Sequence, residues 1–186
     1  KKGQLIIISG PSGVGKGTVI KGLISKYPDY VLSISMTTRP PRDHEVEGKD
    51  YFFVSDKQFD HYIEKDAFIE WCQVHTHRYG TLKVQVDAQC DKGNNVFLEI
   101  DTQGAKKVRQ KFPDTFSIFI APPSLEDLAK RLQKRNTEGQ SELQHRLANA
   151  NKELAEIGDY NIVLINEDID RAIDELHNVI DIELQK

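Results

Sequence analysis

The stretch Gly10-Pro11-Ser12-Gly13-Val14-Gly15-Lys16-Gly17-Thr18 decides the fold of this chain. It follows the apolar segment Leu5–Ser9, which predicts a buried strand, and leads into Thr18–Lys26, which predicts a helix. Such a turn is typical of a phosphate-binding P-loop, because its backbone N–H groups and the helix N-terminus converge on one anion. Lys16 adds a charge that reaches the β- and γ-phosphates. A chance glycine-rich turn would not explain why strand, spacing and helix agree, so we expect all nine residues to bind ATP.

One position departs from the usual P-loop pattern. Gly17 follows the lysine, and the hydroxyl group stands one position later, at Thr18. Two alternatives stay open for the magnesium ion that accompanies ATP. Either Thr18 is a ligand, or water and substrate oxygens hold most of the ion's coordination sphere, as Mg²⁺ tolerates.

The rest of the chain alternates short apolar strands with amphipathic helices. This pattern predicts an α/β fold, a parallel sheet covered by helices on both faces. Strands are expected at Val31–Ser35, Val96–Ile100, Phe116–Ile120 and Ile162–Ile165. Helices are expected at Gln103–Lys111, after the capping-type run Ser124–Asp127, and at the C-terminus, where Ile169, Ile173, Leu176 and Ile180 recur at helical spacing.

Two segments differ from this pattern. Residues 35–90 are richer in aromatics and alternating patterns, which predicts a small inserted lobe of short antiparallel strands with a helix at Lys57–Lys65. Residues 134–146 are polar and arginine-rich, which predicts an irregular mobile segment. We therefore expect one domain over residues 1–186, with a core formed by residues 1–34, 91–133 and 147–186.

The composition of the chain limits the classes of protein to which it can belong. No apolar run exceeds four residues, whereas a membrane-spanning helix needs about 20 and the apolar part of a secretory signal about 7–15. The net charge of −4 argues against a nucleic-acid-binding surface. Cys72 and Cys90 form no disulfide framework or Cys-x-x-Cys pair, which favours reduced thiols and a cytoplasmic protein. Either a monomer or a homodimer is compatible with the sequence.

A second anion site is indicated downstream of the P-loop. Ser35-Met-Thr-Thr-Arg39-Pro-Pro-Arg42 places two arginines three residues apart, ahead of Gly48–Tyr51. Guanidinium groups match phosphate oxygens, and the hydroxyls of Tyr51 and Tyr79 add neutral donors. By composition alone, a solvated loop with incidental charges is the stronger alternative. Arg78, directly before Tyr79, is a candidate for a third cation near this phosphate. His75 and His77 would share a strand face, but no third metal ligand is evident.

Several segments, in order over nearly the whole chain, together resemble guanylate kinase: Gly10–Thr18, Ser35–Arg42, Glu45–Tyr51, Phe68–Trp71, Tyr79–Thr81, Glu99–Gly104 and Ala121–Asp127. The resemblance implies a transferase of purine metabolism that catalyses ATP + GMP → ADP + GDP with Mg²⁺. It implies a P-loop kinase core, a GMP-binding lobe at residues 35–90 and a lid at residues 134–146. Its partners would be the two nucleotide substrates, without nucleic acid or membrane.

The resemblance also implies roles for individual residues. The phosphate of GMP would be held by Arg39, Arg42, Tyr51 and Tyr79, and guanine would be read by Ser35, Glu70 and Thr81. Glu99 and Asp101 would lie near magnesium and the phosphates, with Asp101 acting on the ion through water. Arg131, Arg135 and Arg146 would close over ATP, and Asn166 would contact adenine. The catalytic set would be Lys16, Arg39, Asp101, Arg135 and Arg146.

The chemistry of the base agrees with the role implied for Glu70. Guanine presents N1–H and N2–H donors side by side, and one ionised carboxylate accepts both. Adenine offers a lone pair at N1, so it would leave the buried charge unpaired. Two alternatives remain open: a kinase for another nucleoside monophosphate, and an inactive guanylate-kinase-like module that binds phosphopeptides. The intact Gly15-Lys16 argues against the module.

Overall fold

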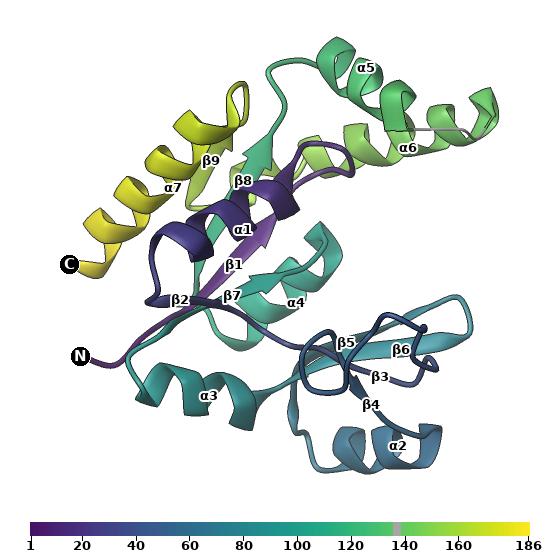
Figure 1. Ribbon diagram of the computed structural model, residues 1–186, viewed down its shortest axis with the longest axis vertical. Helices are drawn as coiled ribbons and strands as arrows, with labels where there is room; N and C mark the ends of the chain where they lie inside the picture. The colour runs from purple at the N-terminus through teal and green to yellow at the C-terminus, as the bar shows by residue number, and fades with distance from the viewer. Residues whose placement is uncertain (136–138) are drawn as a thin grey trace.

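The main sheet of the protein has five parallel strands. The computed structural model describes residues 1–135 and 139–186, and its strand order is β2-β7-β1-β8-β9 (Figure 1). The strands are β2 (Tyr30–Leu32), β7 (Asn95–Glu99), β1 (Leu5–Ser9), β8 (Phe116–Ala121) and β9 (Ile162–Ile165). All four pairings are parallel, so the predicted α/β fold is confirmed.

Helices cover both faces of this sheet. The side chains in the middle of β1 alternate between the two faces and are all apolar, so each face must be shielded from water. Ile6 and Ile8 pack toward α1 (Lys16–Lys26) and α7 (Ile169–Leu184), whereas Ile7 packs toward α3 (Lys83–Asp91) and α4 (Thr102–Lys111). All three isoleucines are fully buried. The strand and the P-loop after it are therefore fixed from both sides.

Two further helices project beyond the carboxyl ends of the strands (Figure 1). α5 (Leu125–Arg135) and α6 (Gln140–Leu154) pack through Leu128, Leu132 and Ala150, and a 3₁₀ turn, η1 (Ile157–Asp159), follows. The prediction of an irregular segment at residues 134–146 is wrong at both its ends, which are helical. Leu143, Leu147 and Ala150 recur at helical spacing, a signal that the charged residues obscured. Residues 136–138 lie outside the described residues.

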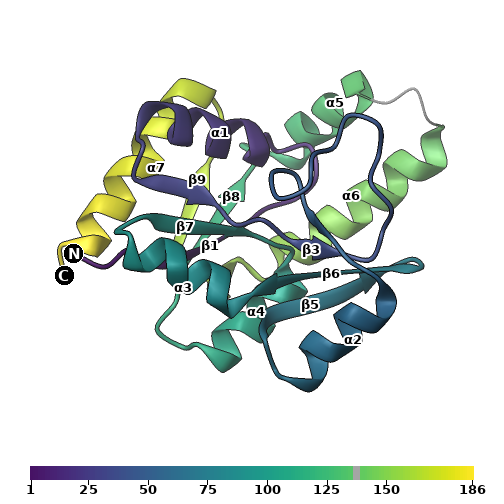
Figure 2. The same cartoon turned by 60° about the horizontal axis from the view of Figure 1, so that its bottom comes forward.

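The inserted segment forms a small lobe with a second sheet, ordered β4-β3-β6-β5. Its strands are β4 (Phe52–Phe53), β3 (Met36–Thr37), β6 (His77–Leu82) and β5 (Phe68–Val74), and α2 (Asp56–Glu64) lies on one face (Figure 2). Phe59 of α2 is fully buried against Met36, Phe68 and Leu82. The lobe therefore has a hydrophobic core separate from that of the main sheet.

Three details of the lobe differ from the sequence prediction. β3 and β4 pair in parallel, not antiparallel. The strand expected at Val31–Ser35 ends at Leu32, which leaves residues 33–35 as the connection between the two sheets. Helix α3 was not predicted, because the alternation around Val84 and Val86 is typical of a strand. The helix that was predicted at Lys57–Lys65 is confirmed, with Ser55 and Gln58 forming its capping box.

Across the described ranges, no helix combines the length and the apolar character that crossing a bilayer requires. Both cysteines are free thiols, as expected.

The separate core of the lobe leads to a stability prediction. Phe59→Ala should lower the free energy of unfolding by about 3–5 kcal/mol, because it removes a large side chain from a closed cluster. The measurement is urea denaturation followed by tryptophan fluorescence, since Trp71 packs edge-on against Phe59. Val84→Ala, at a residue 67% exposed, is the control and should change little. Equal, small effects of the two variants would contradict a separate core.

Candidate active site

The P-loop forms a cradle at the carboxyl end of β1. All of its residues except the fully buried Val14 line one pocket, together with Lys21, Glu99, Asp101 and Glu153. Gly13 and Gly15 have φ values of +85° and +87°, a region in which a side chain is strained. A Cβ on Gly10 would lie 2.5 Å from the carbonyl oxygen of Ile120, so the loop also needs glycine for close approach to β8.

The back of the P-loop is held by two side chains. The carbonyl oxygen of Val14 accepts hydrogen bonds from Asn166 Nδ2 at 2.7 Å and from Arg131 Nη1 at 3.1 Å. Arg131 Nη2 also donates to the carbonyl oxygen of Asn166 at 3.0 Å. Asn166 is 1% exposed. In this conformation the two residues act on the loop from behind. The contacts to ATP phosphates and adenine that the resemblance implies for them stay predictions.

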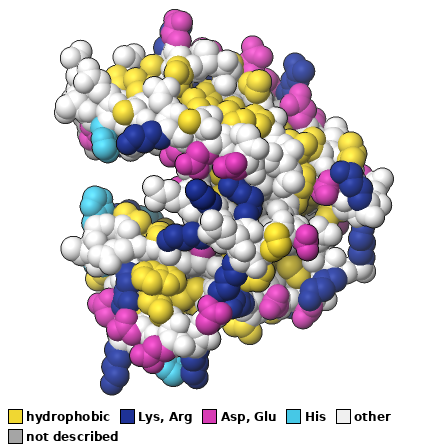
Figure 3. Space-filling view, turned by 180° about the vertical axis from the view of Figure 1, so that it is seen from behind, with side chains coloured by type: hydrophobic (Ala, Val, Ile, Leu, Met, Phe, Trp, Pro, Cys, Tyr) yellow, Lys and Arg dark blue, Asp and Glu magenta, His cyan; other side chains and the backbone are white. Residues whose placement is uncertain are grey.

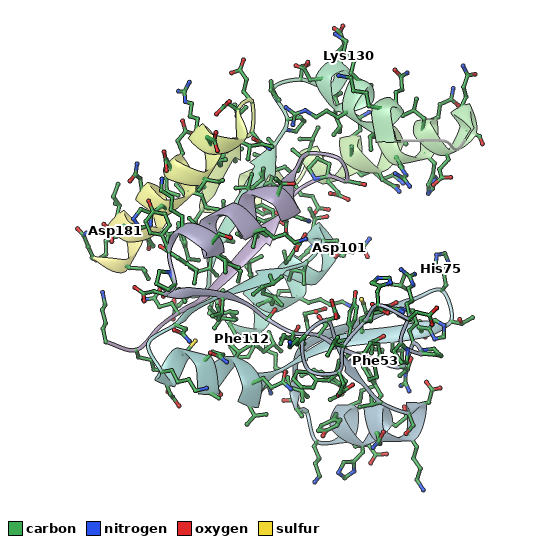
Figure 4. All side chains as sticks on the ribbon, in the orientation of Figure 1. Phe53, His75, Asp101, Phe112, Lys130 and Asp181 are labelled. Carbon is green, nitrogen blue, oxygen red and sulfur yellow. The ribbon has the colours of Figure 1, made fainter. Side chains whose placement is uncertain are left out.

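Lys16 connects the P-loop to a second pocket. Its ammonium group lies 3.3 Å from the carbonyl oxygen of Gly10, to which it donates, and 3.8 Å from Glu99 Oε1. Lys16, Glu99 and Asp101 also line a pocket that includes Ser35 and Tyr51. Asp101 stands at the N-terminus of α4, where Oδ1 accepts from the Gly104 N–H at 2.7 Å (Figure 4). The two pockets therefore share three charged residues.

Tyr51, which lines the second pocket, belongs to a cluster with Arg39 and Tyr79. The Arg39 guanidinium lies 5.2 Å from the centre of the Tyr51 ring, and the rings of Tyr51 and Tyr79 are 5.9 Å apart. Arg39 is also paired with Glu45, at 2.7 Å. Arg42 is an exposed residue of the same loop, and its backbone N–H donates to Glu45. The structure thus brings together most of the predicted phosphate ligands.

Glu70 and Thr81 face each other across β5 and β6. Burial, aided by the Asp101 charge and opposed by Lys107, raises the pKa of Glu70 to about 7. Thr81 is 1% exposed, and within the described residues its hydroxyl group has no hydrogen-bond partner. A buried polar atom without a partner is costly, so this position favours a polar ligand.

Several predicted residues lie away from these pockets. Arg78 is on the opposite face of β6, where it pairs with Asp56 and Asp60 and covers Phe59, so the hypothesis of a third phosphate cation is wrong. His75 and His77 do not share a strand, because His75 lies in the hairpin turn with a φ of +55° (Figure 4). No group of three metal-ligating side chains occurs among the residues that the structure describes.

The structure describes the side chain of one of the two arginines in the predicted lid. Arg146 pairs with Glu142 on α6 at 3.0 Å. Arg135 ends α5, and its side chain lies outside the described residues. A deep hollow separates the part of the molecule that carries α5 and α6 from the small lobe (Figure 3).

Three charged residues of the pockets were missed by the sequence analysis, and one of them is Lys21 of α1, which lines the P-loop pocket. Glu153, on α6, lines the P-loop pocket, and Asp50 lines the second pocket. Asp50 stands beside Tyr51 in a segment already singled out, so proximity was an available signal. Glu153 is one of several charged residues on a helix, and no pattern distinguishes it.

A phosphate cradle at a helix N-terminus, joined through shared charges to a second anion site, defines a P-loop nucleoside monophosphate kinase. The family model described as guanylate kinase matches residues 2–183. A guanylate kinase of Caldanaerobacter subterraneus subsp. tengcongensis is 52% identical over 97% of this chain and 87% of its own length, and one of Thermotoga maritima is 41% identical over 100% and 89%. The crystal structure of guanylate kinase from Anaplasma phagocytophilum superposes with a TM-score of 0.76 at 34% identity, covering 100% of this chain and 88% of that one. The chain belongs to the guanylate kinase family.

The bond from Asn166 to Val14 leads to a binding prediction. Asn166→Ala should weaken the binding of ATP and of inorganic tripolyphosphate by the same factor, roughly 5- to 100-fold. The reason is that the buried carbonyl group of Val14 loses a hydrogen-bond donor, so that the P-loop is held less firmly. Both affinities can be measured by titration calorimetry. Asn178→Ala, on the exposed face of α7, serves as the control. A loss confined to ATP would indicate instead that Asn166 acts on adenine.

Proposed function

We propose that this chain transfers the γ-phosphoryl group of ATP to the phosphate of GMP, forming ADP and GDP. The observation that carries the proposal is that the P-loop pocket and the second pocket share Lys16, Glu99 and Asp101. ATP would occupy the P-loop pocket, and GMP would occupy the pocket of the small lobe. Residues 35–90 would then be the GMP-binding lobe and residues 134–146 the lid. We place the reaction in the cytoplasm.

The reaction needs alignment more than proton transfer. The attacking group is a phosphate oxygen of GMP, which is largely ionised near neutral pH because its second pKa is about 6. Lys16 would follow the charge that develops on the γ-phosphoryl group, supported by the backbone N–H groups of the P-loop. Arg39, Arg42 and the hydroxyls of Tyr51 and Tyr79 would hold the acceptor phosphate in line.

Base recognition would fall to Ser35, which lines the second pocket, and to Glu70 and Thr81, which face each other on the nearby sheet of the small lobe. The carboxylate of Glu70 would accept N1–H and N2–H of guanine, and Thr81 and Ser35 would supply hydroxyl groups. The unpartnered hydroxyl of Thr81 supports this arrangement, since a bound base would satisfy it. Adenine offers no donor at N1 and would be rejected.

Magnesium fits the P-loop pocket as a companion of ATP. Thr18 and Asp101 line that pocket, and oxygen atoms are the ligands that Mg²⁺ prefers. Thr18 would bind the ion directly and Asp101 through water, with phosphates and further water completing its shell. When bound, the ion would supply positive charge that offsets the negative charge of the phosphates.

Closure would exclude water from the reacting groups. We propose that Arg131, Arg135 and Arg146 approach the ATP phosphates when α5 and α6 move over the P-loop. The hollow between these helices and the small lobe leaves room for that movement (Figure 3). Without closure, water would accept the phosphoryl group.

A substrate panel tests the proposed function. ADP formation from ATP and Mg²⁺ should be rapid with GMP and slow with AMP, CMP or UMP. Lys16→Ala should lower the rate with GMP by at least about 100-fold, because it removes a charge from the transferring group. Lys26→Ala, at the far end of the same helix, should keep full activity. Comparable turnover with another monophosphate would contradict the base assignment, and no turnover with any would favour the interaction module.

The raised pKa of Glu70 predicts how base binding depends on pH. If guanine needs the ionised carboxylate, guanosine should bind about tenfold more weakly at pH 6 than at pH 8, because Glu70 becomes protonated below about 7. Guanosine is the chosen probe because it lacks the phosphate that titrates near pH 6. Glu70→Gln should bind guanosine weakly at both pH values. A flat profile in the unchanged protein would remove the role of the Glu70 charge.

A further inference from the structure

Arg39 is held by a carboxylate to which the proposed reaction gives no role. Its Nη1 donates to Glu45 Oε1 at 2.7 Å, and its Nη2 donates to Glu45 Oε2 at 2.8 Å. The side chains are 13% and 7% exposed, so little water competes for this two-pronged pair. Such a pair fixes the plane of the guanidinium as well as its position.

The hydrogen bonds of Arg39 leave one edge of its guanidinium available. A guanidinium has five N–H donors in a fixed fork geometry. Nη1 uses its second proton on the carbonyl oxygen of Pro40, at 3.0 Å. The Nε proton and the second proton of Nη2 take no part in the bonds to Glu45 and Pro40, and they lie side by side as a second fork. That fork matches two oxygens of a phosphate group. The Tyr79 hydroxyl group, itself a predicted phosphate ligand, also interacts with this guanidinium.

Glu45 also orders the loop that carries the second arginine. Its Oε1 accepts the backbone N–H of Arg42 at 2.8 Å. The ring of Tyr51 lies under the Arg39 guanidinium, at 5.2 Å. The guanidinium is thus fixed at its end by a carboxylate and over its face by an aromatic ring.

The Glu45 charge persists over the working range of pH. The hydrogen bond from Arg39, aided by the backbone N–H of Arg42, lowers the pKa of Glu45 to about 2. Arg39 therefore meets an ionised partner at any pH at which the protein would function, and the pair does not come apart by titration.

We propose that Glu45 is a positioning residue for the acceptor phosphate: it takes the end-on fork of Arg39, so that the side-on fork is presented to GMP. The proposal rests on the proposed function, in which Arg39 binds that phosphate. Glu45 itself touches no reacting atom. It removes the rotational freedom that the long arginine side chain would otherwise lose when GMP binds.

The test is Glu45→Gln, which keeps the size of the side chain and removes its charge. Gln offers one acceptor oxygen and turns its NH₂ group toward the guanidinium, so it cannot form the two-pronged pair. We expect the KM for GMP to rise on the order of tenfold and the KM for ATP to stay unchanged. Asp43→Asn, an equal charge change on an exposed residue of the same loop, should change neither.

A double-mutant cycle separates positioning from a merely structural role. If Glu45 acts through Arg39, Glu45→Gln should cost nothing further in the Arg39→Ala background. An equal additional loss of GMP affinity in that background would overturn the proposal, and so would parallel increases in the KM of GMP and ATP. Tighter GMP binding by Glu45→Gln would also overturn it, since Glu45 would then be competing with the phosphate.

Different results would contradict the proposed function and the positioning role of Glu45. The proposed function fails if the unchanged protein does not phosphorylate GMP, and that result needs no variant. The positioning role fails if the unchanged protein is active and Glu45→Gln has the same KM for GMP. Thermal unfolding of each variant confirms that the comparison is made between folded proteins.

Discussion

The carbonyl oxygen of Val14 is the point on which the nucleotide site depends. A P-loop turns its N–H groups toward an anion only if the carbonyl groups of the same peptides turn away, and a buried carbonyl without a donor is costly. Here Asn166 and Arg131 supply the donors from behind the loop. Asn166 follows β9, its backbone N–H donates to Ala121 at the end of β8, and Arg131 belongs to α5. The anion cradle is therefore fixed by parts of the chain more than 100 residues away.

The parallel sheet brings the two pockets together. Ligands of open α/β sheets bind outside the carboxyl ends of the strands, where β1 leads into the P-loop and β7 ends at Glu99. Because β1 and β7 are neighbours, Lys16 lies 3.8 Å from Glu99, and both face the pocket of the small lobe. Residues 33–35, directly after β2, connect the main sheet to the small lobe. Its sheet thus stands opposite the P-loop.

The sequence was most informative where local chemistry decides the structure. The turn of the P-loop between a strand and a helix, four of the five core strands and the helix of the small lobe follow from spacing and residue type, and the structure has them close to the expected bounds. The fifth core strand, expected at Val31–Ser35, ends at Leu32. Local patterns failed where tertiary packing decides. Helix α3 has an alternating pattern, yet Val86 and Cys90 are buried one helical turn apart. Arg78 looked like a phosphate ligand because it precedes Tyr79, but alternation along β6 turns it to the other face. Glu45 lay in a segment singled out by resemblance, and only the folded loop shows its partner.

Glu45 and Glu70 of the small lobe carry the same carboxyl group, but their surroundings shift its pKa in opposite directions. Glu45 has two donors already in place, so its pKa falls to about 2 and its charge is fixed. Glu70 is buried without such donors, so its pKa rises to about 7 and its charge depends on what binds. Guanine would supply the missing donors and stabilise the ionised form. A protonated Glu70 would instead present an O–H to the lone pair at N1 of adenine. Selectivity between the bases, on this account, rests on the ionisation of one carboxyl group and is strongest above pH 7, where burial no longer keeps that group neutral.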